Sequence, residues 1–243
     1  MNVVAQLKNV NKIYKSGDNQ VEALAPTSID IKTNQLTLIL GPSGSGKTTL
    51  LSLIGCVIYP TSGEIFLDDL KINNLSENEL AKLRLNKIGF VFQSFNLIQP
   101  LTALENVMQP LLLKGYSRKE AEDISRKALE KMGLSERLKN LPKNLSGGQQ
   151  QRVAIARALV TEPEIILCDE PTASLDNKSI KVVLDDLKEL SLSGKAVVIV
   201  THDDRLKEYA DCIYYVVDGE VSTKPHHEEA FVFDPSKTHS NDN

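Results

Sequence analysis

Residues 41–48 read Gly41-Pro42-Ser43-Gly44-Ser45-Gly46-Lys47-Thr48, and they lie between two apolar segments. Residues 36–40 before them are typical of a buried strand, and residues 49–54 after them are typical of a helix. A strand, a glycine-rich turn and a helix in this order form the setting in which the pattern G-x-x-x-x-G-K-[ST] binds phosphate. The sequence therefore predicts a phosphate-binding loop at the start of a helix.

Each residue type in this loop has a physical reason to hold phosphate. Gly41, Gly44 and Gly46 permit backbone angles and close approaches that a Cβ would block, so that successive N–H groups can point into one concavity. The helix that begins near Lys47 adds the positive end of its dipole. The pattern then places Lys47 on the β- and γ-phosphates of a nucleotide, and the Thr48 hydroxyl on Mg²⁺.

The composition is that of one large soluble domain or two closely joined ones. The chain has 243 residues, of which 41% are hydrophobic and 25% are charged, with a formal net charge of −4. An acidic balance argues against nucleic acid as the main partner. The three cysteines, Cys56, Cys168 and Cys212, are odd in number and widely spaced, which predicts reduced thiols. Because no apolar run is long enough to span a bilayer and no secretory signal begins the chain, we expect a cytoplasmic protein.

The first part of the chain reads as β structure. Residues 3–14 alternate loosely, which predicts an antiparallel edge strand, and residues 21–24 and 28–31 read as two further strands. Tyr14 stands just before a turn. From the local sequence it is equally well explained as a stacking surface for a purine ring or as an ordinary strand tyrosine.

A helical segment interrupts this β structure between about residues 104 and 159. Ser76 with Glu79, and Ser117 with Glu120, form capping boxes that predict helix starts. Residues 87–93 precede the helical segment and read as a strand ending on Gln93. The economical interpretation is a helical insertion in an α/β core.

Continuous apolar runs return at residues 164–170 and 195–202, and they are typical of strands buried on both faces of a parallel sheet. Residues 179–190 between them form an amphipathic helix pattern, and Asp218-Gly219 later predicts a hairpin turn. From Thr223 onward the chain is polar, and we expect a solvated tail. Its His226-His227-Glu228-Glu229 run imposes no metal-binding geometry.

A second anion-binding cap is predicted at Leu145-Ser146-Gly147-Gly148-Gln149, before a helix over about residues 151–159. One nucleotide does not obviously need two such caps. A head-to-tail dimer explains both, because the second cap of one subunit can close over the γ-phosphate held by the first loop of the other.

Taken together, these motifs resemble those of the nucleotide-binding subunit of an ABC transporter. Residues 41–48 resemble Walker A, residues 145–149 the family signature, Ile165-Ile166-Leu167-Cys168-Asp169-Glu170 Walker B, Gln93 the Q-loop, Ala173-Ser174-Leu175-Asp176 the D-loop and His202 the switch histidine. They follow the family's order and cover the chain to about Val221. The signature is the discriminating motif, because many phosphate-loop enzymes share Walker A alone.

The resemblance implies an α/β fold: a P-loop NTPase core with a parallel sheet, an N-terminal antiparallel β subdomain and an inserted α-helical subdomain. It implies one ATPase domain over residues 1–222, with the core at about 1–95 and 160–222 and the helical subdomain at about 96–159. Residues 223–243 would form the polar tail.

The resemblance also implies the cofactors ATP and Mg²⁺ and a role for each matching residue. The catalytic group would be Glu170, His202, Gln93 and Lys47. Mg²⁺ would be held by Thr48, Gln93 and Asp169. ATP would be bound by Tyr14 stacking on adenine, by Gly41, Pro42, Ser43, Gly44, Ser45, Gly46, Lys47, Thr48 and Thr49, and across the dimer by Ser146, Gly147, Gly148, Gln149 and Asp176.

Residues 90–97 and 101–107, with residues 59–63 upstream, resemble the LolD/MacB-type branch, whose members extract lipoproteins, drive export or transmit mechanical work. This implies a homodimer bound to separate integral membrane permease subunits of the MacB, LolC or FtsX kind, docked at residues 94–98 and 101–107 and placing the chain on the inner face of the cell membrane. Two alternatives stay open, an FtsE-like ATPase that pulls on a membrane partner without transport and a soluble ABC ATPase of the repair or translation type.

Overall fold

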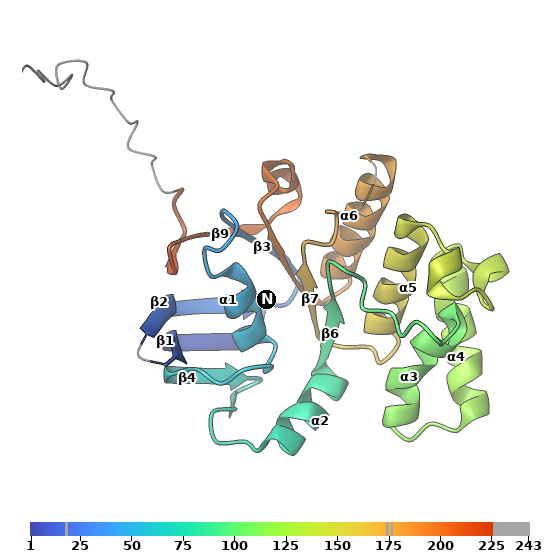
Figure 1. Ribbon diagram of the computed structural model, residues 1–243, viewed down its shortest axis with the longest axis horizontal. Coiled ribbons are helices and arrows are strands. Elements are labelled where there is room, and N and C mark those ends of the chain that lie inside the picture. The colour runs from blue at the N-terminus through green and yellow to red at the C-terminus, as the bar shows by residue number, and fades with distance from the viewer. Residues whose placement is uncertain (18, 174, 176, 226–243) are drawn as a thin grey trace, which may run out of the picture.

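The computed structural model describes residues 1–17, 19–173, 175 and 177–225, and it forms two sheets with helices packed around them (Figure 1). In chain order the elements are β1 (Val3–Ser16), β2 (Asn19–Lys32), β3 (Gln35–Leu40), α1 (Lys47–Ile54), β4 (Ser62–Leu67), β5 (Leu70–Lys71), α2 (Glu77–Lys87), β6 (Ile88–Val91), α3 (Ala103–Leu113), α4 (Arg118–Lys131), η1 (Ser135–Arg137), η2 (Pro142–Asn144), α5 (Gly147–Leu159), β7 (Ile165–Asp169), α6 (Asn177–Leu192), β8 (Ala196–Thr201), η3 (Asp204–Tyr209), β9 (Cys212–Val217) and β10 (Glu220–Ser222).

The larger sheet has the order β10-β9-β3-β8-β7-β6. The pairs from β9 to β6 are parallel, and β10 pairs antiparallel with β9 through the hairpin predicted at Asp218-Gly219. The whole of β8 is buried, as the continuous apolar run predicts. Because parallel strands end at one edge, the residues that follow β3, β6, β7 and β8 meet there.

The smaller sheet is antiparallel, with the order β2-β1-β4-β5. The prediction of an edge strand at residues 3–14 is wrong, because β1 pairs with β2 on one side and with β4 on the other. The two strands expected at 21–24 and 28–31 are one strand, β2. Val10 pairs with Thr27 and Lys12 pairs with Leu24, so two residues of β2 lie opposite one residue of β1. This bulge accommodates Pro26, whose missing N–H would otherwise break the ladder.

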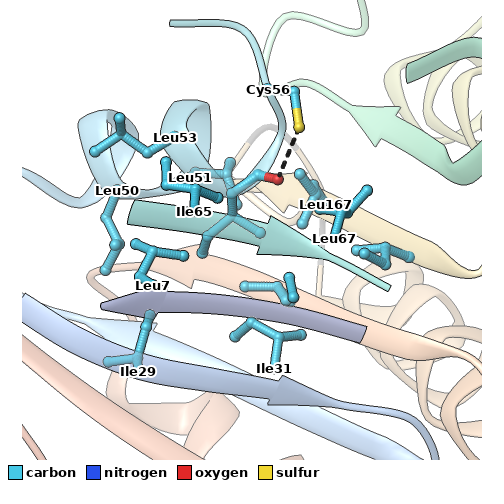
Figure 2. Packing of buried hydrophobic residues seen from close by; sticks show 14 of the residues in the cluster. Leu7, Ile29, Ile31, Leu50, Leu51, Leu53, Cys56, Ile65, Leu67 and Leu167 are labelled. Carbon is cyan, nitrogen blue, oxygen red and sulfur yellow. Dashed lines mark hydrogen bonds between the residues drawn. The ribbon is translucent and has the colours of Figure 1, made fainter. Parts of the chain in front are cut away.

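Helix α1 joins the two sheets through one apolar core (Figure 2). Its Leu50, Leu53 and Ile54 are fully buried. They belong to the same cluster as Leu7 of β1, in the smaller sheet, and Leu167 of β7, in the larger sheet. The helix that begins at the phosphate loop is therefore anchored by both sheets. Cys56, Cys168 and Cys212 are free thiols, as expected, and burial raises the pKa of Cys56 to about 12.

Helices α3, α4 and α5 form a layer beside the edge strand β6, with a core of their own (Figure 1). Capping boxes begin α2 at Ser76 and α4 at Ser117, as predicted. Helix α5 begins at Gly147, earlier than the expected start near residue 151, so both signature glycines lie in its first turn. Within the described residues, no helix is long and apolar enough to cross a membrane.

Candidate functional site: the carboxyl edge of the parallel sheet

The candidate site lies where the central parallel strands end. The phosphate loop follows β3, and Gly41 N donates to Thr201 O at the end of β8, at 3.4 Å. Asp169 ends β7 and is level with Val200 of β8. On the other side of β7, Val91 of β6 is level with Cys168, so Gln93, two residues farther on, reaches the same edge. Gln93 is exposed, and it lies beyond β6 instead of ending the strand as expected.

Backbone packing explains two glycines of the loop. A Cβ on Gly41 would lie 2.0 Å from Val216 O, and a Cβ on Gly46 would lie 2.3 Å from Ala23 O. Gly46 is also the N-cap of α1, with a φ of 106° that favours glycine. These close approaches hold the loop at the helix N-terminus, where backbone N–H groups are unpaired.

The loop also carries a buried hydroxyl that suits a polar ligand. Ser45 is 4% exposed, and its Oγ has no hydrogen-bond partner in the part of the chain that the structure describes. Its carbonyl oxygen accepts from Gly219 N at 2.9 Å, which ties the loop to the β9–β10 hairpin. An unpaired buried polar atom next to a helix N-terminus fits the phosphate group of ATP.

The side chain of Lys47 extends back to the first residues of the loop. Its Nζ donates to Pro42 O at 2.6 Å, and the residue is 6% exposed. Burial lowers the pKa of Lys47, although Glu170 and Asp169 act to raise it. A desolvated ammonium held in this position is suited to an anionic ligand, since its attraction to charge is less screened than in water.

Thr48 and Asp169 approach each other across the edge of the sheet. Thr48 Oγ1 lies 3.5 Å from Asp169 Oδ2. Burial raises the pKa of Asp169, with a further contribution from the neighbouring Glu170. A hydroxyl and a carboxylate are hard oxygen donors of the kind that Mg²⁺ prefers, and no salt bridge is formed by Asp169 among the described residues, so these residues fit the ion.

Glu170 is the most firmly held carboxylate of the site. Its Oε2 accepts from Thr201 Oγ1 at 2.8 Å, and its Oε1 accepts from His202 N at 3.1 Å and lies 2.7 Å from His202 Nδ1. The Glu170 side chain is 13% exposed and the His202 side chain 64% exposed. The structure thus brings the predicted pair together. Sequence reasoning missed Thr201, a polar residue that ends an otherwise apolar buried strand directly before His202.

The second cap lies on another element. Ser146 Oγ accepts from Gln149 N while Gln149 Oε1 accepts from Ser146 N, a capping box at the start of α5. Among the described residues, no hydrogen bond joins residues 146–149 to the phosphate loop. Within one chain the two caps are therefore separate.

Two further predicted site residues have different outcomes. Tyr14 is 43% exposed on β1, and Lys12 Nζ lies 5.1 Å from its ring centroid. It pairs with Val21 of β2, two residues from Ala23, which abuts Gly46. Asp176, like Ser174 of the same predicted loop and the His226-His227-Glu228-Glu229 run, lies outside the described residues.

Comparisons with known proteins agree on one family. The family profile described as ABC transporter matches residues 24–173. An ABC transporter ATP-binding protein of Methanocaldococcus jannaschii, MJ0796, is 51% identical over 221 residues, covering 89% of this chain and 94% of that protein. The macrolide export ATP-binding/permease protein MacB of Mannheimia succiniciproducens is 41% identical over 99% of this chain, which spans 38% of MacB.

A solved structure agrees with this match. It is a dimeric post-hydrolysis state of the MJ0796 cassette bound to ADP and Pi, with a TM-score of 0.84 and 48% identity, covering 90% of this chain and 96% of that one. The phosphate loop, the Glu170–His202 pair and these relatives lead to one conclusion: the chain belongs to the ABC transporter family and is an ATP-binding, ATP-hydrolysing subunit of that family.

Proposed function

We propose that this subunit powers export or extraction by a separate membrane permease, through head-to-tail dimers that close on ATP and reopen after hydrolysis. The observation that carries the proposal is the separation of the two anion-binding caps within one chain. A second copy supplies the missing cap, with Ser146, Gly147, Gly148 and Gln149 facing the γ-phosphate and Asp176 ordering the opposing site. The dimeric form of the related MJ0796 cassette supports this arrangement.

Within each copy, the loop residues bind the phosphates of ATP. Backbone N–H groups of residues 43–49 and the Lys47 ammonium hold the anionic oxygens, while Pro42 lacks an N–H and shapes the turn. Tyr14 stacks on the adenine. Thr48, Asp169 and Gln93 would hold Mg²⁺, which neutralises phosphate charge when bound.

Glu170 orients the attacking water and polarises it. Three donor groups from Thr201 and His202 already fix its carboxylate, so little reorganisation is needed when water arrives. His202, more exposed than Glu170, extends from the same contact toward the γ-phosphate. Catalysis in this arrangement is mostly positioning and charge stabilisation.

A groove between the parallel sheet and the helical layer is the proposed docking site of the permease. It encloses about 630 Å³. Apolar side chains reach its surface, with Leu113 74% exposed and Ile98 44% exposed. Its lining residues are Ala81, Lys82, Arg84, Leu85, Ile88, Gly89, Phe90, Phe92, Asn96, Ile98, Pro110, Leu113, Arg157, Ala158 and Thr161.

The lining of this groove overlaps the expected docking segments only in part, and we adjust the proposal to it. Asn96 and Ile98 agree with the expected segment 94–98, but residues 101–107 are largely internal, with Ala103 and Val107 fully buried in the helical core. Helix α2 takes their place on the groove. We keep the proposal that residues 96–159 act as a helical subdomain and that docking there places the chain at the inner face of the membrane.

The relatives favour transport over the FtsE-like and soluble alternatives, since MacB is described as an export ATP-binding/permease protein. The test is the partner itself. Leu113→Glu puts a charge on the groove, and Leu192→Glu, at a residue 70% exposed on α6, is the matched control. From the source cell's membranes, the wild type and Leu192→Glu should co-purify one permease that stimulates ATP hydrolysis, while Leu113→Glu should lose it with basal hydrolysis unchanged. Equal recovery by both variants would place docking elsewhere.

A further inference from the structure

We propose that Arg157 is a positioning residue for hydrolysis: its guanidinium clamps the loop that carries Gln93 to helix α5, the helix that begins at the signature. The inference rests on the proposed role of Gln93. It adds a residue that the sequence motifs do not include, and it joins two motifs that lie on different elements.

The clamp consists of two hydrogen bonds. Arg157 Nη1 donates to Asn96 O at 2.6 Å, and Nη2 donates to Phe95 O at 2.8 Å. The planar guanidinium presents its donors as a fixed fork, so two adjacent carbonyl groups can be held only in one orientation. Gln93 is two residues before Phe95, so a shift of this turn moves the glutamine with it.

The clamped turn is strained. Phe95 has a φ of 59° and Asn96 a φ of 47°, two consecutive non-glycine residues in the left-handed region. Such residues cost free energy and persist only where surrounding contacts enforce them. Two backbone hydrogen bonds also lie within the turn, from Phe95 N to Phe92 O at 3.0 Å and from Asn96 N to Ser94 O at 2.6 Å. Without the two hydrogen bonds from Arg157, we therefore expect Phe95 and Asn96 to leave the strained left-handed conformation.

The two hydrogen bonds of the Arg157 guanidinium go to the uncharged backbone carbonyl groups of Phe95 and Asn96. In the described part of the chain no carboxylate forms a salt bridge with it. Arg157 is partly buried, and this burial lowers the pKa of its guanidinium. Because the donor is a cation, its hydrogen bonds to Phe95 O and Asn96 O are charge-assisted and directional.

The position of Arg157 on α5 is itself fixed. The next residue, Ala158, has its carbonyl oxygen packed on Gly89 of β6, where a Cβ would lie only 2.4 Å away. Arg157 follows Ser146 by 11 residues, a rise of about 16 Å along one rigid helix. Asn96 and Arg157 also line the proposed docking groove. A movement of the signature helix or of a docked partner is thus transmitted to the Gln93 loop through one side chain.

The test uses Arg157→Met, Arg157→Lys and the control Arg126→Met, which removes a surface pair with Glu122 on α4. We expect Arg157→Met to lower kcat on the order of tenfold to a hundredfold with an unchanged KM for Mg-ATP, as expected for a misplaced catalytic group. Arg157→Lys, which keeps the cation and loses the fork, should recover part of the rate and guards against a folding defect in the Met variant. Arg126→Met should match the wild type.

The deciding measurement is the double variant Gln93→Ala/Arg157→Met. If Arg157 acts through Gln93, the double variant is no slower than Gln93→Ala alone. Multiplied losses would overturn the inference, as would a wild-type rate in Arg157→Met. A wild-type rate in Gln93→Ala alone would instead contradict the proposed role of Gln93. Amide exchange over residues 92–98 should rise in Arg157→Met and remain unchanged in Arg126→Met.

Discussion

Glu170 shows at the scale of one residue how the fold positions the carboxylate that we propose to be catalytic. Its backbone lies in the left-handed region, with a φ of 47°, where a residue other than glycine is strained. The contacts with Thr201 and His202 hold it there, and its own N–H donates to Val200 O at 2.9 Å. Strain of this kind is typical of functional sites, where the direction of a side chain is maintained at the expense of a relaxed backbone conformation.

Replacing that carboxylate gives the first prediction. Glu170→Gln keeps the shape and removes the charge, so we expect ATP binding to persist and hydrolysis to fall on the order of 10²- to 10³-fold. Retained ATP should then stabilise the dimer, measured by light scattering with and without Mg-ATP. The matched control is Glu162→Gln, an exposed residue with a φ of 56°. Near-normal turnover in Glu170→Gln would remove Glu170 from its role.

Gly46 allows a second prediction, in which backbone strain is separated from contact. Gly46 and Gly194 have φ values of 106° and 105°, but a Cβ on Gly194 meets nothing within 4 Å. Both alanine variants place a Cβ at nearly the same positive φ, and only the Cβ of Gly46→Ala would lie within 4 Å of other atoms, 2.3 Å from Ala23 O. We expect Gly46→Ala to be about 1–3 kcal/mol less stable than Gly194→Ala in urea unfolding and to bind ATP more weakly. An equal loss of stability in the two variants would mean that β2 moves away from the added Cβ without a cost in free energy.

At the scale of elements, the patterns that predict correctly are local. The capping boxes at Ser76 and Ser117 and the apolar run of β8 depend on neighbours in sequence, and the structure confirms them. Element ends were displaced by a few residues at α5 and β6, and the error with structural consequences concerns pairing. The neighbour of β1 on its second side is β4, whose paired residues range from Asn11 with Ser62 to Ala5 with Leu67, and no local pattern reveals such a distant partner. Thr201 was missed for the same reason, because its partner Glu170 directly follows another strand, β7.

Asp211 leads to a prediction about how elements are joined at the opposite end of the sheet. Its carboxylate accepts from Leu36 N of β3 at 2.8 Å and from Lys188 Nζ of α6 at 2.7 Å. Burial would raise the pKa of Asp211, but these two contacts outweigh it, so the pKa is lowered. A lowered pKa means that the contribution to stability is present above the unfolded pKa of about 4 and is lost as the pH falls below it.

We therefore expect Asp211→Asn to lower the free energy of unfolding at pH 7 by about 1 kcal/mol, a modest value because the side chain is partly exposed. The difference from the wild type should shrink as unfolding is measured at pH 5, 4 and 3. Asp69→Asn, on an exposed turn, is the control and should show no such trend. A pH-independent difference would mean that the charge of Asp211 does not contribute.

For the whole molecule, the decisive feature of the proposed function is that each chain carries two anion-binding caps that would complete different sites. The phosphate loop is held between the two sheets, whereas the signature begins a helix of the separate helical layer (Figure 1). Head-to-tail pairing can be tested by mixing two variants that each lack one of the two caps. Lys47→Ala disables the loop of its chain, and Ser146→Arg disables the signature of its chain. In a mixed dimer both defects fall in one site, and the other site is intact.

We expect either variant alone, each also carrying Glu170→Gln, to form no dimer with ATP. An equal mixture should form heterodimers that retain one ATP for every two chains, measured by size-exclusion chromatography with labelled nucleotide. If both caps served one nucleotide within a chain, mixing would restore nothing, because every chain would still hold one defect. As a control, mixing Lys47→Ala with a Lys47→Ala/Ser146→Arg chain should also restore nothing, since no copy then supplies an intact loop.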